Sequence, residues 1–501
     1  SYGRTQIRRA DIDPKKETVG TAFHSIKNPP ILRGEMPLEP RASWKYPTIV
    51  RAVKPTDACP YPFLILLIFL EYSFLPKKPA SGGRSPMDKR HRAKERAKKG
   101  SIRLLMRRHP DLNMDGPLTV NYANSTLEET VLEINPHSWT KVASIIFVDQ
   151  PAGTGFAYAK TPEAYITNDT LSAMQAYSFL KKWLVDHPKL LNNPLYVAGD
   201  SYMGILLPMI VQEIYNGNEV GEGPRINIKG YSLGNPLTDT GGNYNSRIRY
   251  AHRMALLSDA IYKSAEENCD GEYWKIDPNN SLCIQALQVV DKCIGRIRSP
   301  QILEPYCDDS NTLKFYLSRR GLGTLDKIFM DTWSLPQVQK QSCRDDNYLY
   351  SYVWANNRDV REALHVHEEF GDIEWVRCND SLYFYYDKEA ISYTHDVLNT
   401  VGYHQRISDK HCRALIYSGD HDMVAPYIST LDWIESLNLS VVDGWRPWFV
   451  DDQVAGYTMK YSKNNYHLTF ATVKGGGHTA PEYKPKECLS MFMRWLANDS
   501  L

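Results

Sequence analysis

Short apolar runs rich in β-branched residues alternate with helical patterns from about Asp111 onward, and this alternation constrains the fold more than any other feature. Runs typical of buried strands occupy 143–148, 195–198, 226–233, 414–417 and 468–473. Apolar residues recur at helical spacing in 173–185, 205–215 and 491–496. Strands that alternate with helices form a mostly parallel sheet covered by helices on both faces. The sequence therefore predicts an α/β fold for residues 111–501.

One segment, residues 240–345, interrupts this alternation with turn residues and closely spaced cysteines. The four cysteines in its first part are Cys269, Cys283, Cys293 and Cys307. We predict an inserted cap stapled by disulfides, which suits an oxidising compartment. The chain has nine cysteines, so at least one thiol stays unpaired. No Cys-x-x-Cys pair or zinc-finger histidine spacing is present, so we predict neither a metal nor another cofactor.

Residues 1–110 show no sustained strand or helix period, and we predict an atypical tail that is disordered or wrongly assigned. Its basic stretch, 89–108, fits either nucleic-acid binding or a solvated charged run, and the lack of aromatic residues among the charges favours the second. The chain has 59 basic and 58 acidic residues, so its overall charge gives no reason to expect a nucleic-acid partner.

The apolar run 63–70 is the one long hydrophobic stretch of the tail. It is much shorter than the roughly 20 residues of a membrane-spanning helix, so we predict no membrane span. The alternatives are a displaced secretory leader and a buried strand.

The sequence from Leu195 to Gly204, Leu-Tyr-Val-Ala-Gly-Asp-Ser-Tyr-Met-Gly, places Ser201 between a buried strand and an apolar helix. A hydrolase nucleophile sits on such a sharp turn, where the next backbone N–H, here from Tyr202, points at the oxyanion. The second glycine comes one residue later than in the usual Gly-x-Ser-x-Gly pattern. On spacing alone, a structural serine is an equal alternative.

Two later strands are each followed by a polar residue of the type that would complete a triad. Asp422 lies in Ser-Gly-Asp-His-Asp after one strand, and His478 follows three glycines after the next. A turn-capping aspartate and a structural histidine are the alternatives for each alone, and Asp420 competes with Asp422. The order Ser, Asp, His, with each residue after a strand, favours a catalytic triad of Ser201, Asp422 and His478.

These residues resemble the serine carboxypeptidase-like proteins of plants, over about Asp111 to the end of the chain. The resemblance rests on the segment 135–158, on Gly-Asp-Ser-Tyr at 199–202, on Gly-Asn-Pro at 234–236 and on Gly-Gly-Gly-His-Thr-Ala at 475–480. It implies an α/β-hydrolase fold with an inserted cap, disulfides, and residence in the secretory pathway, either vacuolar or extracellular. It also places the triad on Ser201, Asp422 and His478. Six Asn-x-Ser/Thr sequons fit the same route, at Asn124, Asn168, Asn279, Asn379, Asn438 and Asn498.

The resemblance leaves two enzymatic outcomes open. Carboxypeptidases of the family carry Glu before the serine, where it helps to hold the substrate's terminal carboxylate, and this chain has Asp200 there. An alternative role for Asp200 is a structural hydrogen bond inside the turn. The segments 419–422, 445–457 and 477–484 look more like the acyltransferase branch, which transfers acyl groups from glucose esters to an alcohol or amine. A third possibility is a catalytically impaired relative that acts as a binding protein.

One element of the family is missing from the sequence. Relatives carry a Gly-Gly-Pro-Gly-Cys segment on an early loop, which supplies a second oxyanion donor and a disulfide cysteine, and this chain has no such segment. The N-terminal part of the fold is therefore expected to be incomplete, and Cys343 is expected to be the odd thiol. Loss of one oxyanion donor typically lowers the rate about 100-fold to 1,000-fold. Met203, where relatives carry a small residue, is expected to crowd the turn.

Overall fold

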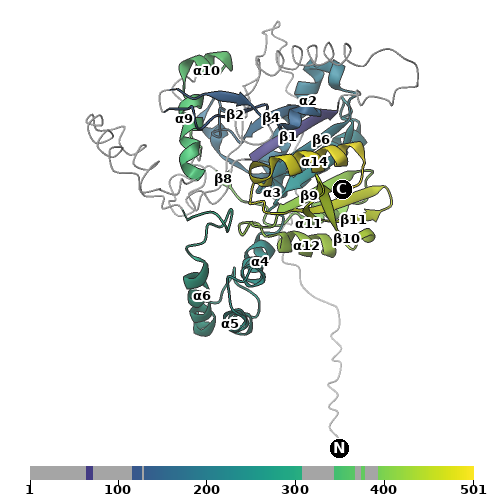
Figure 1. Cartoon of the computed structure of the whole chain (residues 1–501). Coiled ribbons are helices and arrows are strands. Elements are labelled where there is room, and N and C mark those ends of the chain that lie inside the picture. Colours follow the sequence, from purple (N-terminus) through teal and green to yellow (C-terminus); the bar gives the residue numbers. More distant parts are fainter. Residues whose placement is uncertain (1–63, 72–115, 127–128, 307–343, 367–373, 378–392) are drawn as a thin grey trace, which may run out of the picture. The chain divides into compact units, whose positions relative to one another are not determined.

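A central sheet of eight strands organises the computed structural model, which describes residues 64–71, 116–126, 129–306, 344–366, 374–377 and 393–501 (Figure 1). The strand order is β10-β11-β12-β9-β7-β6-β1-β4. In chain order these strands are β1 (Leu64–Glu71), β4 (Ala143–Gln150), β6 (Leu195–Asp200), β7 (Ile228–Gly234), β9 (Arg413–Gly419), β10 (Ser440–Val450), β11 (Gln453–Lys463) and β12 (Tyr466–Val473). Two small sheets pair β2 (Leu118–Val120) with β3 (Leu132–Ile134), and β5 (Thr167–Asn168) with β8 (Tyr393–Thr394).

The central strands run parallel, as the sequence predicts. Strand β6 pairs with β7, β7 with β9, and β9 with β12, all in parallel. Strand β1 is antiparallel to both β4 and β6, so β4 points in the same direction as β6. Strand β11 is antiparallel to its neighbours β10 and β12. The carboxyl ends of β6, β7, β9 and β12 therefore meet at one edge of the sheet, which is where ligands bind in α/β folds.

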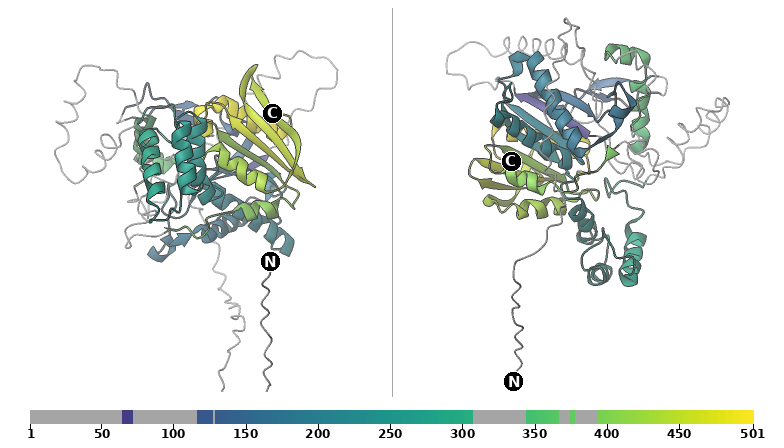
Figure 2. Two further views of the ribbon diagram at one scale, coloured as in Figure 1. Left: turned by 90° about the horizontal axis from the view of Figure 1, so that it is seen from below. Right: turned by 180° about the vertical axis from the view of Figure 1, so that it is seen from behind.

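Helices cover both faces of the sheet, and two separate cores result. On one face, α2 (Asp169–Asp186), α3 (Met203–Val220), α11 (Val401–Ile407) and α12 (Tyr427–Ser436) pack against residues such as Ile416 and Phe470. On the other, α14 (Pro485–Ala497) packs against residues such as Leu415 and Ala471. Neighbouring residues of one strand thus face opposite cores, as the two-residue period of a strand requires. Figure 1 shows α14 across the front of the sheet, and the view from behind in Figure 2 shows helices over the other face.

Each strand and helix predicted within residues 111–501 is present, and the structure extends most of them. The predicted strand 195–198 becomes Leu195–Asp200, and the predicted helix 205–215 becomes Met203–Val220. The apolar run 63–70 forms β1, so one of its two predicted alternatives, a strand, is what the structure contains. This strand belongs to the sheet although it precedes residue 111. The basic stretch 89–108 lies outside the described residues.

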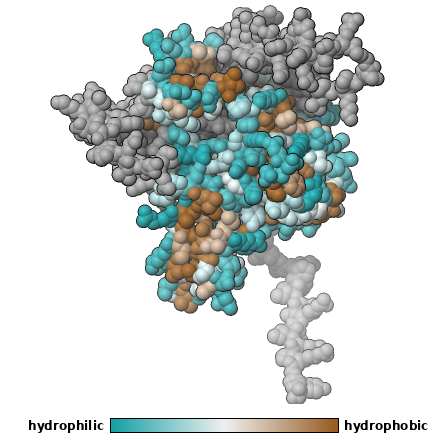
Figure 3. All heavy atoms as spheres, viewed as in Figure 1, coloured by the Kyte–Doolittle hydropathy of each residue, from teal (hydrophilic) through white to brown (hydrophobic). Residues whose placement is uncertain are grey.

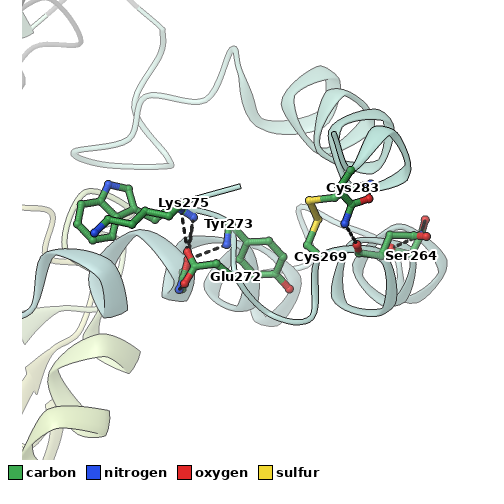
Figure 4. Close-up of a disulfide and its surroundings, with 10 residues drawn as sticks. Ser264, Cys269, Glu272, Tyr273, Lys275 and Cys283 are labelled. Atoms are coloured by element: carbon green, nitrogen blue, oxygen red, sulfur yellow. Dashed lines mark hydrogen bonds between the residues drawn. A yellow bond between two sulfur atoms is a disulfide. The ribbon is translucent and has the colours of Figure 1, made fainter. Parts of the chain in front are cut away.

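The described part of the predicted cap contains three helices and a disulfide. The helices are α4 (Thr240–Arg253), α5 (Asp259–Cys269) and α6 (Ser281–Ile294). Cys269 and Cys283 are bonded to each other at an S–S distance of 2.05 Å and join α5 to α6 (Figure 4). Cys293 is an exposed thiol, while Cys307 and Cys343 lie outside the described residues. The limits 240–345 for the cap remain a prediction.

The helices α4, α5 and α6 share an apolar cluster that also includes residues after β9. Ala265 of α5 and Val290 of α6 belong to one buried cluster with Met423 and Ile428, which follow β9. The opposite side of α6 exposes Leu282, and Leu303 further along is 72% exposed. Figure 3 shows apolar side chains gathered in this part of the surface. The helices of the predicted cap are thus packed against the chain that follows β9, where Asp422 lies.

The remaining described helices are short. They are α9 (Tyr348–Ala355), α10 (Arg358–Ala363), α13 (Ala480–Tyr483) and the 3-10 turns at Trp139–Lys141, Pro162–Tyr165, Pro188–Leu190 and Arg344–Asn347. No helix in the described ranges is both long and apolar enough to cross a membrane. Within the same ranges, no three His, Cys, Asp or Glu side chains come close enough together to hold a metal ion.

Candidate active site

Ser201 lies on a strained turn at the carboxyl end of β6. Its φ angle is +56°, in the left-handed region that a serine rarely adopts, so the surrounding structure must hold it there. The loop after β7 does so from both sides: the Ser201 N–H donates to the carbonyl of Gly234, and the Leu237 N–H donates to the carbonyl of Ser201, each at 2.9 Å. Helix α3 begins two residues later at Met203. The serine therefore stands at the start of a helix, above the end of a central strand.

Gly204 explains why the glycine of this turn comes late. A Cβ atom at Gly204 would lie 2.4 Å from the carbonyl oxygen of Leu237 and 2.7 Å from its nitrogen. Only a glycine lets the chain after β7 approach the first turn of α3 this closely. Met203 is fully buried in the core beneath α3, and its crowding of the turn stays a prediction.

Asp422 and His478 occupy the loops that follow β9 and β12. Asp422 comes three residues after Gly419, the last residue of β9, and His478 comes five residues after Val473, the last residue of β12. Both side chains are buried, with exposures of 0% and 1%, and Ser201 is 4% exposed. Three segments distant in the sequence thus place one polar side chain each at the same edge of the sheet.

A continuous hydrogen-bond chain joins the three side chains. Ser201 Oγ lies 2.7 Å from His478 Nε2, and His478 Nδ1 lies 2.7 Å from Asp422 Oδ2. An ionised carboxylate only accepts, so Nδ1 carries the hydrogen that it donates to Asp422. In the neutral ring, Nε2 is then left with a lone pair that can accept the Ser201 hydroxyl proton. This arrangement can deprotonate the serine as it attacks a carbonyl.

The carboxylate of Asp422 is held by three further donors besides His478. The N–H groups of Val424 and Ala425 donate to Oδ1 and Oδ2 at 2.7 and 3.1 Å, and Asn235 Nδ2 donates to Oδ2 at 2.8 Å. With donors on both oxygens, the carboxylate cannot rotate away from the imidazole.

Asn235 is a residue of the site that the sequence analysis did not single out. Its side chain also accepts from the N–H of Gly419 at 3.0 Å, and its own N–H donates to the carbonyl of Tyr417 at 2.7 Å. It is fully buried and has φ +40°, a conformation that asparagine tolerates better than most residues. The signal available was the Gly-Asn-Pro sequence directly after a central strand.

Asp420, the competing aspartate, has a different role. Its Oδ1 accepts from the N–H of Gly475 at 2.7 Å and so caps the turn that leads to His478. Burial raises the pKa of its carboxyl group, an effect opposed by the nearby charge of His421. Asp420 therefore shapes the loop, whereas Asp422 is the aspartate that contacts the imidazole.

Helix α4 of the predicted cap supports the same loop. The hydroxyl of Tyr250 donates to the carbonyl of Asp420 at 2.8 Å, and Asn243 Nδ2 donates to the carbonyl of Val424 at 2.9 Å. Burial, together with the charges of Asp422 and Asp420, raises the pKa of the Tyr250 hydroxyl. Tyr250 is therefore a neutral donor near pH 7.

Tyr202, the residue after the serine, is fixed by its side chain. Its hydroxyl donates to Asp169 Oδ1 at 2.7 Å and lies 2.5 Å from His395 Nδ1. Burial raises the pKa of Asp169, although hydrogen bonds from Tyr202 and Tyr393 oppose this effect. Burial also lowers the pKa of His395 to about 4, so the ring is neutral near pH 7. The backbone N–H of Tyr202, the predicted oxyanion donor, thus belongs to a residue with little freedom to move.

Three further predictions concern Asp200, the second oxyanion loop and the segments that resemble the acyltransferase branch. Asp200 is the last residue of β6 and is buried next to the serine, 9% exposed. The region before Asp111, where relatives carry the glycine-rich oxyanion loop, lies outside the described residues apart from β1. Among the segments that resemble the acyltransferase branch, Trp448 is fully buried in the hairpin of β10 and β11, and its Nε1–H donates to the carbonyl of Thr472 at 3.0 Å. That part of the motif therefore supports the sheet.

Comparison with known proteins identifies the family. The sequence profile of the serine carboxypeptidase family matches residues 113–498. Serine carboxypeptidase-like 17 from Arabidopsis thaliana is 44% identical over 366 residues, 73% of this chain and 74% of the relative. Serine carboxypeptidase-like 19 from the same plant is 44% identical over 375 residues, 74% of this chain and 77% of the relative.

A solved structure shares the fold. It is the crystal structure of a prohormone-processing carboxypeptidase from Saccharomyces cerevisiae, with a TM-score of 0.56 and 18% sequence identity, over 77% of this chain and 79% of that one. The fold of this chain is accordingly an α/β-hydrolase fold. The chain belongs to the serine carboxypeptidase family, in its plant serine carboxypeptidase-like group.

Proposed function

We propose that the chain is an enzyme that works through an acyl-serine intermediate on Ser201, with His478 as general base and Asp422 as the residue that orients it. The observation that carries the proposal is the unbroken hydrogen-bond chain Ser201–His478–Asp422, with both distances at 2.7 Å. Membership of the serine carboxypeptidase family supports a hydrolase. The backbone N–H of Tyr202 is the proposed oxyanion donor.

The reaction divides into two halves. In the first, Ser201 Oγ attacks an ester or peptide carbonyl while its proton passes to His478 Nε2. The leaving alcohol or amine then takes that proton as its bond to the acyl carbon breaks. In the second half, His478 removes a proton from an incoming water, alcohol or amine, which attacks the acyl-serine and regenerates the free hydroxyl.

The proposal covers both ways of resolving the acyl-serine. With water as acceptor, the enzyme is a serine carboxypeptidase that hydrolyses peptides at their C-terminus, and Asp200 beside the serine is then the candidate partner of the substrate's carboxyl group. With an alcohol or amine as acceptor, it is a glucose-ester-dependent acyltransferase of plant secondary metabolism. The sequence of residues 477–484 and 419–422 favours the second outcome.

Labelling with a fluorophosphonate tests the chemistry without knowledge of the acyl group. The expected result is a single adduct on Ser201, located by mass spectrometry of the purified full-length protein, that is lost in Ser201→Ala. The matched control is Ser418→Ala, since Ser418 is also fully buried near the end of a central strand but contacts Thr430 instead of a histidine. Failure of the wild-type protein to form an adduct, while a relative reacts, would favour a binding protein.

Product analysis then separates the two outcomes. The protein is incubated with a blocked dipeptide and, separately, with an acyl glucose ester plus an alcohol, and the products are identified by mass spectrometry. Release of a free C-terminal amino acid supports the carboxypeptidase, and a new ester supports the acyltransferase.

We also propose a secretory, vacuolar or extracellular location. The disulfide between Cys269 and Cys283 supports it, because such bonds form and persist in oxidising compartments.

A further inference from the structure

A short segment after α6, Ser299–Ile302, contacts both loops that hold the acid and the base; we call it the strap. Three of its residues, Pro300, Gln301 and Ile302, are buried. The loop Asp420–Ala425 is called the acid loop and the loop Lys474–Thr479 the base loop. The strap comes from the predicted cap, so the contacts join a part of the chain outside the sheet to the triad.

The strap forms hydrogen bonds with the acid loop in both directions. The N–H of Met423, next to Asp422, donates to the carbonyl of Ser299 at 2.8 Å. The N–H of Ile302 donates to the carbonyl of His421, on the other side of Asp422, at 3.1 Å. The residues before and after Asp422 are thus both tied to the strap.

The strap also holds the base loop, and does so at His478 itself. The N–H of His478 donates to the carbonyl of Pro300 at 2.7 Å, and Gln301 Nε2 donates to the carbonyl of Gly475 at 3.1 Å. A Cβ atom at Gly477 would lie 2.4 Å from the Pro300 oxygen, so the strap lies directly against this loop.

A network of ionic side chains anchors both ends of the strap. Arg298, just before it, and Glu304, just after it, form an ion pair at 3.3 Å. Arg344 Nε donates to Glu304 Oε1 at 2.8 Å, and its Nη1 donates to Glu482 Oε1 at 3.2 Å. Glu482 Oε2 in turn accepts from the hydroxyl of Thr479, the residue after His478, at 3.1 Å. Glu304 therefore connects the strap with the base loop.

Strand pairing alone does not fix the separation of the acid and base loops. Strands β9 and β12 are paired up to Gly419 and Val473, but Asp422 and His478 lie beyond these ends, where the ladder no longer fixes the spacing. Direct contact between the loops includes the bond from the His421 N–H to the Gly476 carbonyl, at 2.9 Å. The strap adds contacts immediately beside both catalytic side chains.

We propose that the strap is a positioning element of the triad, which sets the separation of the acid and base loops, and that Gln301 within it and Glu304 just after it are positioning residues. The inference rests on the proposed acyl-serine chemistry. Neither residue touches the reacting atoms, so each acts through the placement of His478 against Asp422 and Ser201. Displacement of a catalytic group by about 1 Å can lower a rate by about 100-fold.

Two variants test the proposal, each measured by its rate of fluorophosphonate labelling. Gln301→Ala removes the donor to Gly475, and Glu304→Gln removes the charge that pairs with Arg298 and Arg344. The expected result is labelling slowed roughly 10-fold or more at a temperature well below the melting temperature of every variant. The pH profile of labelling is measured as well, because a purely structural role would leave it unchanged. Glu304→Asp, which keeps the charge, is expected to recover part of the rate.

The control breaks a somewhat more exposed ion pair that lies outside the strap and both loops. Asp443→Asn removes the pair between Asp443 and Arg446, whose exposures are 32% and 35%, and is expected to leave the labelling rate and the pH profile unchanged. Lower melting temperatures for Gln301→Ala and Glu304→Gln with a labelling rate and pH profile like those of the wild type would assign the strap a structural role and overturn the proposal.

Hydrogen exchange separates failure of the strap from failure of the proposed function. Peptides that cover the acid and base loops are expected to exchange faster in Glu304→Gln, and a peptide from β6 is expected to be unchanged. If the wild-type protein is not labelled at all, the proposed acyl-serine chemistry fails, and the exchange data alone decide whether the strap holds the two loops. Unchanged exchange in both loops would overturn the proposal in either case.

Discussion

The close approach of the chain after β7 to the first turn of α3 predicts that Gly204→Ala will slow the enzyme without unfolding it. A Cβ atom at this position would lie 2.4 Å from the Leu237 oxygen, whereas ordinary contacts are 3.4–4 Å, so Leu237 must move by about 1 Å. The bond from the Leu237 N–H to the Ser201 carbonyl, now 2.9 Å, would then lengthen beyond hydrogen-bond range. Ser201, which has φ +56°, would then lose one of its three backbone hydrogen bonds and keep those with Gly234 and Gly204.

The expected magnitudes follow from these movements. Overpacking against backbone typically costs about 1–3 kcal/mol of the free energy of unfolding, and the lost hydrogen bond contributes about 1 kcal/mol of it. A displacement of this size at the nucleophile is expected to reduce the rate by about 100-fold, since the serine, the imidazole and the oxyanion donor must stay aligned. Asn235 lies two residues from Leu237 and holds Asp422, so the acid would be disturbed as well.

The assay is the second-order rate of labelling of Ser201 by a fluorophosphonate, measured beside the melting temperature. The matched control is Gly444→Ala, because a Cβ atom at Gly444 would meet no atom within 4 Å. The expected result is a melting temperature a few degrees lower and slow labelling for Gly204→Ala, with little change in either quantity for Gly444→Ala. Gly204→Ala that labels as fast as the wild-type protein would show that the close approach does not position the serine.

Three further predictions address the triad and the core. Asp422→Asn is expected to reduce the labelling rate about 1,000-fold to 10,000-fold at pH 7, because the amide no longer fixes the imidazole tautomer, and labelling within tenfold of the wild type would argue against Asp422 as the orienting acid. Ser201→Gly is expected to be more stable than Ser201→Ala by about 1 kcal/mol in the free energy of unfolding, because glycine adopts φ +56° without strain. Ser201→Gly should therefore melt at a higher temperature, and the reverse order in a melting experiment would contradict the strain at this position. Burial lowers the pKa of His404 to about 3, below the value of about 6.5 expected in the unfolded state. As the pH falls, the unfolded state therefore binds a proton at this histidine before the folded state does. The free energy of unfolding is expected to fall by up to about 5 kcal/mol as the pH drops from about 6.5 toward 3. Urea unfolding across this pH range measures the free energy of unfolding, which is expected to depend less on pH in His404→Gln than in the wild type. His467→Gln, at an exposed histidine on β12, is the control and is expected to keep the pH dependence of the wild type. An equal pH dependence in His404→Gln and the wild type would refute the argument.

Much of the fold could be predicted from the sequence because the central strands are buried on both faces. Such strands appear as continuous apolar runs, and the runs at 195–198 and 414–417 mark β6 and β9 correctly. Strand ends were less certain, since Gly199, Asp200, Ser418 and Gly419 are not apolar although they pair within the sheet. The place of β1 between β4 and β6 could not be predicted, because pairing between segments so distant in the sequence leaves no local pattern.

For the site as well, the sequence predicts the residues that meet but not the distant segments that support them. The sequence order of Ser201, Asp422 and His478, each after a strand, predicts which residues come together, and the structure places them in one hydrogen-bond chain. It does not reveal the supports, because the strap and, apart from its bond to Asp422, Asn235 are bonded to the backbone of other segments, and such bonds do not depend on the partner's side chain. Their roles as positioning residues remain proposals.

Strand β1 has a practical consequence for anyone who shortens this protein. The family profile begins at residue 113, which makes the preceding residues look dispensable. Yet β1 is hydrogen-bonded to β4 along one side and to β6 along the other, so a shortened chain starting at residue 113 would leave both partners with open edges inside the sheet. Exposed strand edges pair readily with other molecules, and one of these edges belongs to β6, which ends next to Ser201, the proposed nucleophile. Such a trimmed protein is expected to aggregate, and inactivity measured on it would say nothing about the chemistry of the full-length chain.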